Sequence, residues 1–213
     1  VWVRARRLPP TDFRRLPKER RQAEIDRFHE AVDSVSARLQ SQAAQATGEA
    51  AEVLAATAAL ASDRSWVNAA AEMIESGSPA EAAIVNATEK FVRMFQEAGG
   101  RIEERVTDLC DIRDRVVAEL MGEPEPGVPT PEGPVVLLAD DLAPADTARL
   151  DPTLILALCT RLGGLTSHTS VIARQLGIPC VVGVSGLYDV ADGVPVLVNG
   201  AAGTIRTGVQ PED

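Results

Sequence analysis

The sequence predicts two parts, an all-α helical bundle and an α/β unit, and three observations support this. From about Leu16 to Met121 the 213-residue chain is helical in its apolar period and nearly free of proline. The Pro- and Gly-rich residues 123–134 cannot continue a helix and are expected to form a domain linker. Beyond them, short apolar segments bounded by turns alternate with helical ones.

The first part is expected to hold four main helices, one of them broken, joined by short connections. The first has one apolar face at i, i+3, i+4 and i+7 spacing, made by Ile25, Phe28, Val32, Val35 and Leu39. Gly48 opens the second segment, and Asp63 can cap a short third one that ends before Gly77. Residues 78–81, Ser-Pro-Ala-Glu, form a capping box, which predicts a new helix there. Gly99-Gly100 ends that helix, and the last runs from about residue 101 to 120.

The second part is predicted to be an α/β unit of short strands and helices. Strands are expected at 135–138, 154–159, 180–182, 194–198 and 204–207, with helices near 144–149 and 167–176. Residues 1–6 have strand character too and precede the first Pro-Pro pair.

Composition and charge exclude several classes of function. The formal charge is −10; residues 17–123 hold 20 acidic and 12 basic side chains, and residues 124–213 hold 10 and 4. An acidic body argues against nucleic acid and anionic membrane surfaces and suits a basic protein partner. No apolar run approaches the roughly 20 residues of a membrane span, and no signal peptide is expected. Cys110, Cys159 and Cys180 lie in apolar contexts, which predicts reduced core thiols in a cytoplasmic protein.

The most informative stretch runs from Gly163 to Arg174 and reads GGLTSHTSVIAR. It follows a predicted buried strand, so that one of only two histidines, His168, stands where a helix begins. The first N–H groups of a helix lack internal partners and favour anions such as phosphate. Thr166, Ser167, Thr169 and Ser170 place short hydroxyls around the ring, able to cap the helix or bind phosphate oxygens.

Several kinds of site fit this stretch poorly. A Ser-His-Asp hydrolase is disfavoured because no G-x-S-x-G elbow occurs and adjacent side chains do not face each other on a helix. Zinc is disfavoured because His29, the other histidine, lies in a distant segment and the cysteines form no C-x-x-C pair. The glycine spacing matches neither a Rossmann nor a P-loop site. A phosphohistidine site remains, or only a capped turn.

Residues 163–183 resemble the swivelling phosphohistidine domain of phosphoenolpyruvate-utilising enzymes, a family that includes Enzyme I of the sugar phosphotransferase system, pyruvate phosphate dikinase and phosphoenolpyruvate synthase. The form G-G-x-T-S-H-T-S is most similar to Enzyme I. Residues 139–150, ADDLAPADTARL, resemble the A-x-D-L-x-P-x-x-T-x-x-L segment of that enzyme, and residues 101–115, with D-x-x-D-I-x-x-R, resemble its last bundle helix. The resemblance implies an α/β swivelling phosphohistidine domain, residues 1–15 and 127–213, with an inserted four-helix subdomain, residues 16–126, that binds the carrier protein HPr.

The resemblance also implies roles for individual residues. His168 would be the tele-phosphohistidine intermediate, although the sequence alone does not tell which ring nitrogen reacts, and Thr147 would hold its imidazole by a hydrogen bond. The residues that shape the site or bind phosphate would be Gly163, Gly164, Thr166, Ser167, Thr169 and Arg174. The expected HPr contacts lie in the second helix pair, roughly residues 48–77, and are Glu49, Glu52, Leu60, Asp63 and Trp66.

The expected activity is phosphoryl transfer from phosphoenolpyruvate to His168 and on to a histidine of HPr, the first step of sugar uptake by this system. No metal and no cofactor are expected in these residues. Phosphoenolpyruvate and Mg²⁺ would act through a C-terminal barrel that the sequence lacks, so that this chain would exchange phosphoryl groups only with HPr. It would be monomeric, whereas the full-length enzyme would be dimeric. Leu165 stands where some members of the family carry arginine. The alternatives are a swivelling domain of a dikinase or synthase, and a non-catalytic adaptor that binds HPr.

Overall fold

The computed structural model describes residues 2–3, 8–9, 14–103, 105–128 and 130–209. The chain divides into two compact units. The α/β unit comprises residues 1–5, 46–53 and 127–213, and the helical unit comprises residues 6–45 and 54–126. An α/β unit and a helical unit are what the sequence predicts; the domain limits of 1–15, 16–126 and 127–213 stay a prediction.

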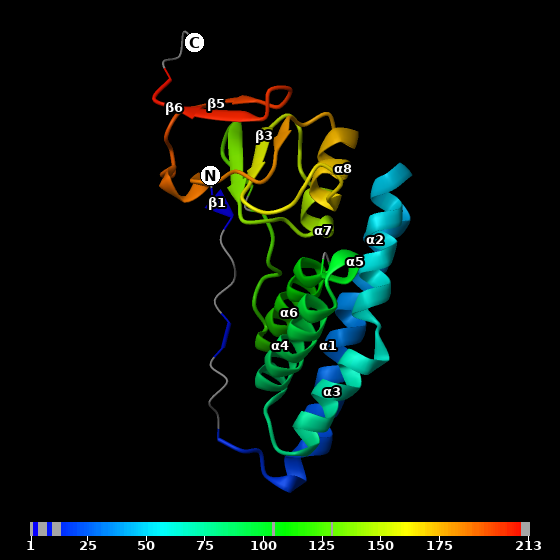
Figure 1. Cartoon of the computed structure of the whole chain (residues 1–213). Coiled ribbons are helices and arrows are strands. Elements are labelled where there is room, and N and C mark those ends of the chain that lie inside the picture. Colours follow the sequence, from blue (N-terminus) through cyan, green and yellow to red (C-terminus); the bar gives the residue numbers. More distant parts are fainter. Residues whose placement is uncertain (1, 4–7, 10–13, 104, 129, 210–213) are drawn as a thin grey trace. The chain divides into compact units, whose positions relative to one another are not determined.

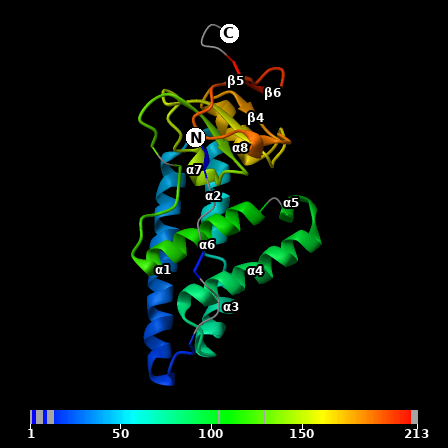
Figure 2. The ribbon, with the colours of Figure 1, turned by 90° about the vertical axis from the view of Figure 1, so that its left-hand side faces the viewer.

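The helices before residue 122 are α1 (Lys18–Gln45), α2 (Gly48–Ala61), α3 (Arg64–Glu75), α4 (Ala80–Ala98), α5 (Gly100–Glu103) and α6 (Val106–Met121). In the helical unit α1 packs against α3 and α6, and α4 packs against α3 and α6. Figure 2 shows α4 and α6 side by side. Four of the five residues predicted for the apolar face of α1, all except Ile25, are at most 5 % exposed. The periodicity therefore predicts the core side of this helix correctly.

The first backbone N–H groups of α3 and α4 find their hydrogen-bond acceptors in different ways, one in a neighbouring residue and one in a distant helix. As predicted, Asp63 caps α3, since its Oδ1 accepts from the backbone N–H groups of Ser65 and Trp66 at 2.9 and 3.2 Å. A helix does start at residues 78–81 as predicted, since α4 begins at Ala80, but the predicted capping box is wrong, because no side chain of that segment caps the helix. The N–H of Ala80 donates instead to Glu24 of α1 at 2.8 Å.

An ion-pair network lies inside the helical unit. Arg115 on α6 is fully buried, and its Nε donates to Asp111 at 2.7 Å. Its Nη1 donates to Glu125, which belongs to the Pro-rich stretch after α6. The arginine of the D-x-x-D-I-x-x-R motif thus connects α6 to the start of the linker.

The α/β unit contains a four-stranded parallel sheet. Its elements are β1 (Trp2–Val3), β2 (Val135–Ala139), α7 (Pro144–Thr147), β3 (Ile155–Thr160), α8 (His168–Gln175), β4 (Cys180–Val181), the 3₁₀ helix η1 (Leu187–Asp189), β5 (Val196–Asn199) and β6 (Thr204–Thr207). The strand order is β1-β2-β3-β4, and β5 with β6 forms a separate antiparallel hairpin. Trp2 of β1 pairs in parallel with Leu138 of β2, so residues of the helical unit are inserted between these neighbouring strands. The other residues of the strand predicted at 1–6 lie outside the described residues.

Alternate residues of the strands cover the two faces of the sheet. Leu137 and Leu158 pack with Ala173 and Ile178 around α8, and Figure 1 shows α7 and α8 beside the sheet. Leu138 and Cys159 face the other cluster, formed with η1 and partly buried side chains of the β5–β6 hairpin. Residues 46–53 join this unit through Gln175 at the end of α8. Its Nε2 donates to the carbonyl of Thr47 at 2.7 Å and its Oε1 accepts from the N–H of Ala50 at 3.0 Å.

Candidate active site

The carboxyl ends of β2 and β3 bring two loops together. Because the strands are parallel neighbours, the loops that follow them start at the same edge of the sheet. The N–H of Arg161 donates to the carbonyl of Ala139 at 3.1 Å, and that of Leu162 to the carbonyl of Asp140 at 2.8 Å. The loop 140–143 after β2 therefore lies beside the loop 161–167 that leads to α8.

His168 is the first residue of α8, as the sequence predicts. Ser167 is the N-cap residue, and its Oγ accepts from the N–H of Ser170 at 3.4 Å. Ser170 Oγ donates in turn to the carbonyl of Gly164 at 2.8 Å. These bonds fix the turn that presents the imidazole at the start of the helix. The ring is half-buried and therefore partly open to solvent.

The imidazole is held by a backbone carbonyl that follows β2. Nε2 of His168 lies 2.5 Å from the carbonyl oxygen of Leu142. A carbonyl oxygen only accepts hydrogen bonds, so Nε2 must carry the proton in this contact. In the neutral ring the lone pair then lies on Nδ1, as it does in any Nε2–H tautomer. The expected Nε2 nucleophile is thus occupied by Leu142 in this conformation.

A second contact ties α8 to the same loop. The hydroxyl of Thr169, which is fully buried, lies 3.1 Å from Asp141 Oδ1 and 3.3 Å from the Leu142 carbonyl. Asp141 Oδ1 also accepts from the N–H of Leu142 at 2.9 Å. Asp141 and Leu142 therefore position both the ring and the helix start. Sequence reasoning missed them, although the strand order would have indicated this edge of the sheet.

Thr147 lies at the end of α7, which follows the same loop, but its hydroxyl does not donate to His168. Its buried hydroxyl donates to the carbonyl of Ala143 at 3.0 Å, one helical turn back. The hydrogen bond to His168 that the resemblance implies is replaced here by the contact from Leu142. The oxygen of Thr147 still has lone pairs with which it can accept an N–H.

The diglycine has two different members. Gly163 has φ +89°, a conformation that L side chains rarely adopt, and a Cβ there would lie 3.2 Å from Ser167 Oγ. A Cβ at Gly164 would meet no atom within 4 Å. Leu165, 79 % exposed, and Thr166, also exposed, complete the loop, and Arg174 donates to the Leu165 carbonyl at 3.4 Å. Gly163 therefore shapes the turn, whereas Gly164 leaves open space beside it.

The five residues predicted to bind a partner differ in how accessible they are. Glu49 and Glu52 on α2 are exposed and Leu60 is half-buried. Trp66 is only 1 % exposed, and its indole Nε1 donates to Thr88 at 3.1 Å. It belongs to the core of the helical unit, because α3 and α4 pack around it, and so it is not available to a partner. Asp63 is exposed, but its carboxylate serves as the cap of α3.

The described thiols are free and suited to a core. Desolvation raises the pKa of Cys159 to about 12 and that of Cys180 to about 11, so both are protonated near neutral pH. Within the described ranges, no three side chains of His, Cys, Asp or Glu gather as a metal site would require. None of the helices among these residues is both long enough and apolar enough to cross a bilayer. The cytoplasmic location expected from the thiols stays a prediction.

Comparison with known proteins gives the family. Residues 1–105 match the model "PEP-utilising enzyme, N-terminal", and residues 131–203 match "PEP-utilising enzyme, mobile domain". A phosphoenolpyruvate-protein phosphotransferase of Streptomyces coelicolor is 43 % identical over 197 residues, which cover 92 % of this chain and 35 % of that protein. One of Haloferax volcanii is 41 % identical over 167 residues, covering 78 % and 29 %. The chain thus spans about a third of the length of these relatives.

A solved structure supports the same relationship. The solution structure of an Enzyme I protein, nEIt, superposes with a TM-score of 0.65 at 28 % identity, covering 94 % of this chain and 84 % of that one. The shared fold includes both the helical unit and the α/β unit. The chain therefore belongs to the phosphoenolpyruvate-utilising enzymes and corresponds to the N-terminal region of Enzyme I.

Proposed function

We propose that His168 accepts a phosphoryl group and exchanges it with a histidine of the carrier protein HPr, within the phosphotransferase reaction that starts from phosphoenolpyruvate. The observation that carries this proposal is the half-buried imidazole on the first residue of α8, set behind a diglycine turn. A helix start favours the charge of a phosphoryl group, and neighbouring N–H groups can bind its oxygens. The names of the relatives, phosphoenolpyruvate-protein phosphotransferases, support the reaction class.

The contact with Leu142 sets the order of events. In the exchange, the P–N bond on the carrier histidine breaks as a P–N bond to His168 forms, and the carrier ring keeps the electron pair. For Nε2 to be the attacking atom, the neutral ring must change tautomer: Nε2 gives up its proton and Nδ1 gains one by exchange with solvent, and the hydrogen bond to the Leu142 carbonyl must break. We propose that the ring turns away from Leu142 when the carrier docks.

Thr147 is proposed to receive the ring after this turn. Its proton is committed to Ala143, so it would act through its oxygen as an acceptor for the ring N–H. Thr147→Ala should slow transfer, and Thr147→Ser should restore it because a hydroxyl returns. Equal rates for Thr147→Ala and the unaltered chain, both folded by circular dichroism, would remove Thr147 from the site.

The docking surface is proposed to include the exposed acids of α2. Glu49 and Glu52 carry charge that suits a basic carrier, and the chain is acidic as a whole. The double substitution Glu49→Gln and Glu52→Gln should raise the KM for HPr at low salt with little change in kcat. Glu97→Gln, an exposed acid on α4, is the charge control. Equal KM values for the acidic variant and the control would contradict the docking surface.

The binding of phosphoenolpyruvate and Mg²⁺ is proposed to lie outside this chain. The match to this chain covers only about a third of the length of the relatives. We propose that phosphoenolpyruvate and Mg²⁺ bind to the region of the full-length enzyme that lies outside this match.

The test of the whole proposal is transfer in both directions. Phosphorylated HPr mixed with this chain should yield phosphorylated chain by intact mass, and adding unphosphorylated HPr should remove the label. Phosphoenolpyruvate with Mg²⁺ alone should leave the chain unlabelled. Failure of both directions with folded protein would refute phosphoryl exchange and favour an adaptor that only binds HPr. Ultracentrifugation of the same sample tests the expected monomer.

A further inference from the structure

Three side chains outside the site described so far meet at the carboxyl ends of β2 and β3. Nε of Arg161 donates to Asp140 Oδ1 at 2.7 Å, and the hydroxyl of Tyr188 donates to the same oxygen. The guanidinium carbon of Arg161 lies 5.3 Å from the centroid of the Tyr188 ring, within cation–π range. Asp140 follows β2, Arg161 follows β3 and Tyr188 lies on η1, so three separate elements supply the cluster.

This cluster is exposed, so holding the fold together explains it poorly. The side chains of Arg161 and Asp140 are 37 % and 47 % exposed, and Tyr188 is 62 % exposed. Ion pairs at such exposure add little stability. Their clear effect is on orientation, because a hydrogen bond to Nε and an aromatic face under the guanidinium hold a long side chain in one place. Arginine has five N–H donors, so the bond from Nε does not exhaust its capacity.

The cluster is anchored on the loop that also holds the imidazole. Asp140 bonds Arg161, and Leu142, two residues later, accepts from His168. Two residues span at most about 7 Å of extended chain. Arg161 also lies two residues before Gly163, the start of the turn that leads to His168. The two anchoring points are thus close together at one edge of the sheet.

A phosphoryl group in this acidic part of the chain would need a nearby cation. Residues 124–213 contain 10 acidic and 4 basic side chains, and a phosphoryl group adds close to two further negative charges. Two of the four cations, Arg161 and Arg174, flank the loop that carries the diglycine. Arg174 donates to the Leu165 carbonyl at 3.4 Å. A planar guanidinium is the side chain best matched to phosphate oxygens.

We propose that Arg161 is a phosphate-binding residue for the phosphoryl group in transit at His168, held ready for it by Asp140 and Tyr188. The inference rests on the proposed function and adds a residue that none of the sequence motifs contains. The guanidinium donates to phosphoryl oxygens as the group arrives, and Asp140 keeps its bond to Nε. No covalent bond to Arg161 forms or breaks.

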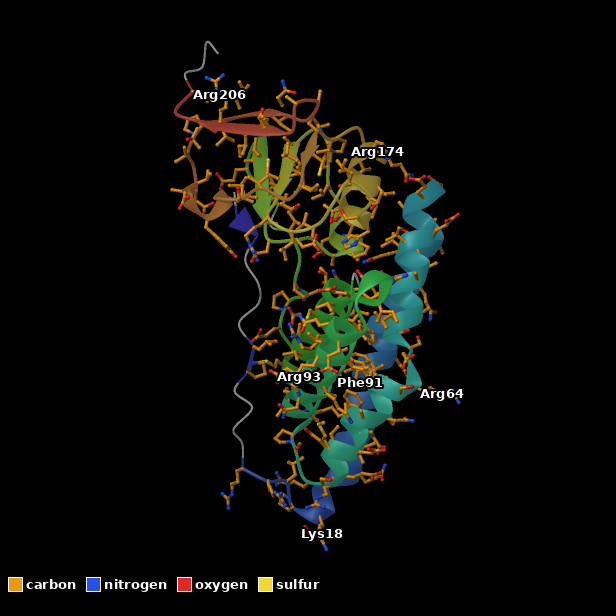
Figure 3. All side chains as sticks on the ribbon, viewed as in Figure 1. Lys18, Arg64, Phe91, Arg93, Arg174 and Arg206 are labelled. Atoms are coloured by element: carbon orange, nitrogen blue, oxygen red, sulfur yellow. The ribbon has the colours of Figure 1, made fainter. Side chains whose placement is uncertain are left out.

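The test compares two cations of the same unit. Arg161→Gln removes the proposed phosphate contact, whereas Arg206→Gln removes equal charge from β6, a different element, as Figure 3 shows. The rate of exchange is measured over a range of phosphorylated HPr concentrations. A charge-assisted hydrogen bond lost in transfer predicts a fall of kcat by about 10- to 100-fold for Arg161→Gln, with KM nearly unchanged. Arg206→Gln should stay within about twofold, since this exposed residue lies on β6 and not on the two loops that carry Arg161 and His168.

A spectroscopic readout separates phosphate binding from a structural role. The ³¹P resonance of the phosphohistidine should shift in Arg161→Gln and return partly toward its position in Arg161→Lys, which restores a cation. Asp140→Asn, which weakens the anchor but keeps the guanidinium, should lower kcat less than Arg161→Gln does. If the unaltered chain takes no phosphoryl group, the proposed function fails. If it does, and Arg161→Gln matches Arg206→Gln in rate and in ³¹P shift, only the role of Arg161 is refuted.

Discussion

The two glycines before the site should respond differently to the same substitution. Gly163→Ala places an L side chain at φ +89°, and a residue forced into this region costs about 1–2 kcal/mol. The new Cβ would lie 3.2 Å from Ser167 Oγ, so the hydroxyl that caps α8 must move, at a cost of about 1 kcal/mol if the cap is lost. Lower chain entropy in the unfolded state returns about 0.4–1 kcal/mol. The net loss of unfolding free energy should be about 1–2.5 kcal/mol.

Gly164→Ala is the matched control. Its φ is not in the left-handed region and its Cβ would meet nothing within 4 Å, so its stability should be unchanged or raised by up to about 1 kcal/mol. The unfolding free energy is measured in urea, with hydrogen exchange at the amides of Ser170 and Val171 as the local probe of the start of α8. Equal unfolding free energies for Gly163→Ala and Gly164→Ala would refute the assignment of strain and capping to Gly163. Gly164→Ala should nonetheless slow exchange with HPr, because its methyl group occupies the open side of the turn.

Three further predictions concern the ion-pair network, the thiols and the imidazole. Arg115→Met should lower the unfolding free energy of the helical unit by about 3–5 kcal/mol, because the carboxylate of Asp111 stays buried without this partner; a loss below about 1 kcal/mol in urea titrations would contradict it. Desolvation raises the pKa of Cys159 to about 12 and of Cys180 to about 11, so iodoacetamide at pH 8 should label both far more slowly in native than in unfolded protein. In the folded chain the pKa of each thiol lies above its unfolded value of about 8.5, so folding favours the protonated thiol. The unfolding free energy should therefore fall as pH rises from about 9 through these folded-state pKa values. Equal labelling rates in native and unfolded protein, or an unfolding free energy that does not change over this pH range, would contradict the prediction. ¹⁵N spectra of His168 at neutral pH should show the Nε2–H tautomer that the Leu142 carbonyl requires, and a dominant Nδ1–H tautomer would contradict that contact.

Local patterns predicted the elements well because burial follows the sequence period. The apolar spacing of α1 and the Gly-Gly and Ser-His order before α8 indicate a helix face and a helix start directly. The start of α4 shows the limit. Ser78 has the right spacing for a capping box, but Glu24 from α1 satisfies the Ala80 amide, and such a partner is distant in sequence.

The site shows the same limit more sharply. The acceptor for His168 is the backbone carbonyl of Leu142, and a carbonyl has no residue type by which a pattern could reveal it. Trp66 was expected on the docking surface because the resemblance implies that HPr contacts the second helix pair, yet packing between α3 and α4 buries it. Arg161 gave no signal until the parallel pairing of β2 with β3 brought it beside Asp140.

The most direct measurement locates the phosphoryl group on the chain after incubation with phosphorylated HPr. Peptide mapping at alkaline pH, where phosphohistidine survives, should place the group on His168 and leave His29 unmodified, and ³¹P–¹⁵N coupling should assign it to Nε2. His168→Ala should take no label while keeping its circular dichroism. Label on His29, or undiminished label on folded His168→Ala, would contradict the account.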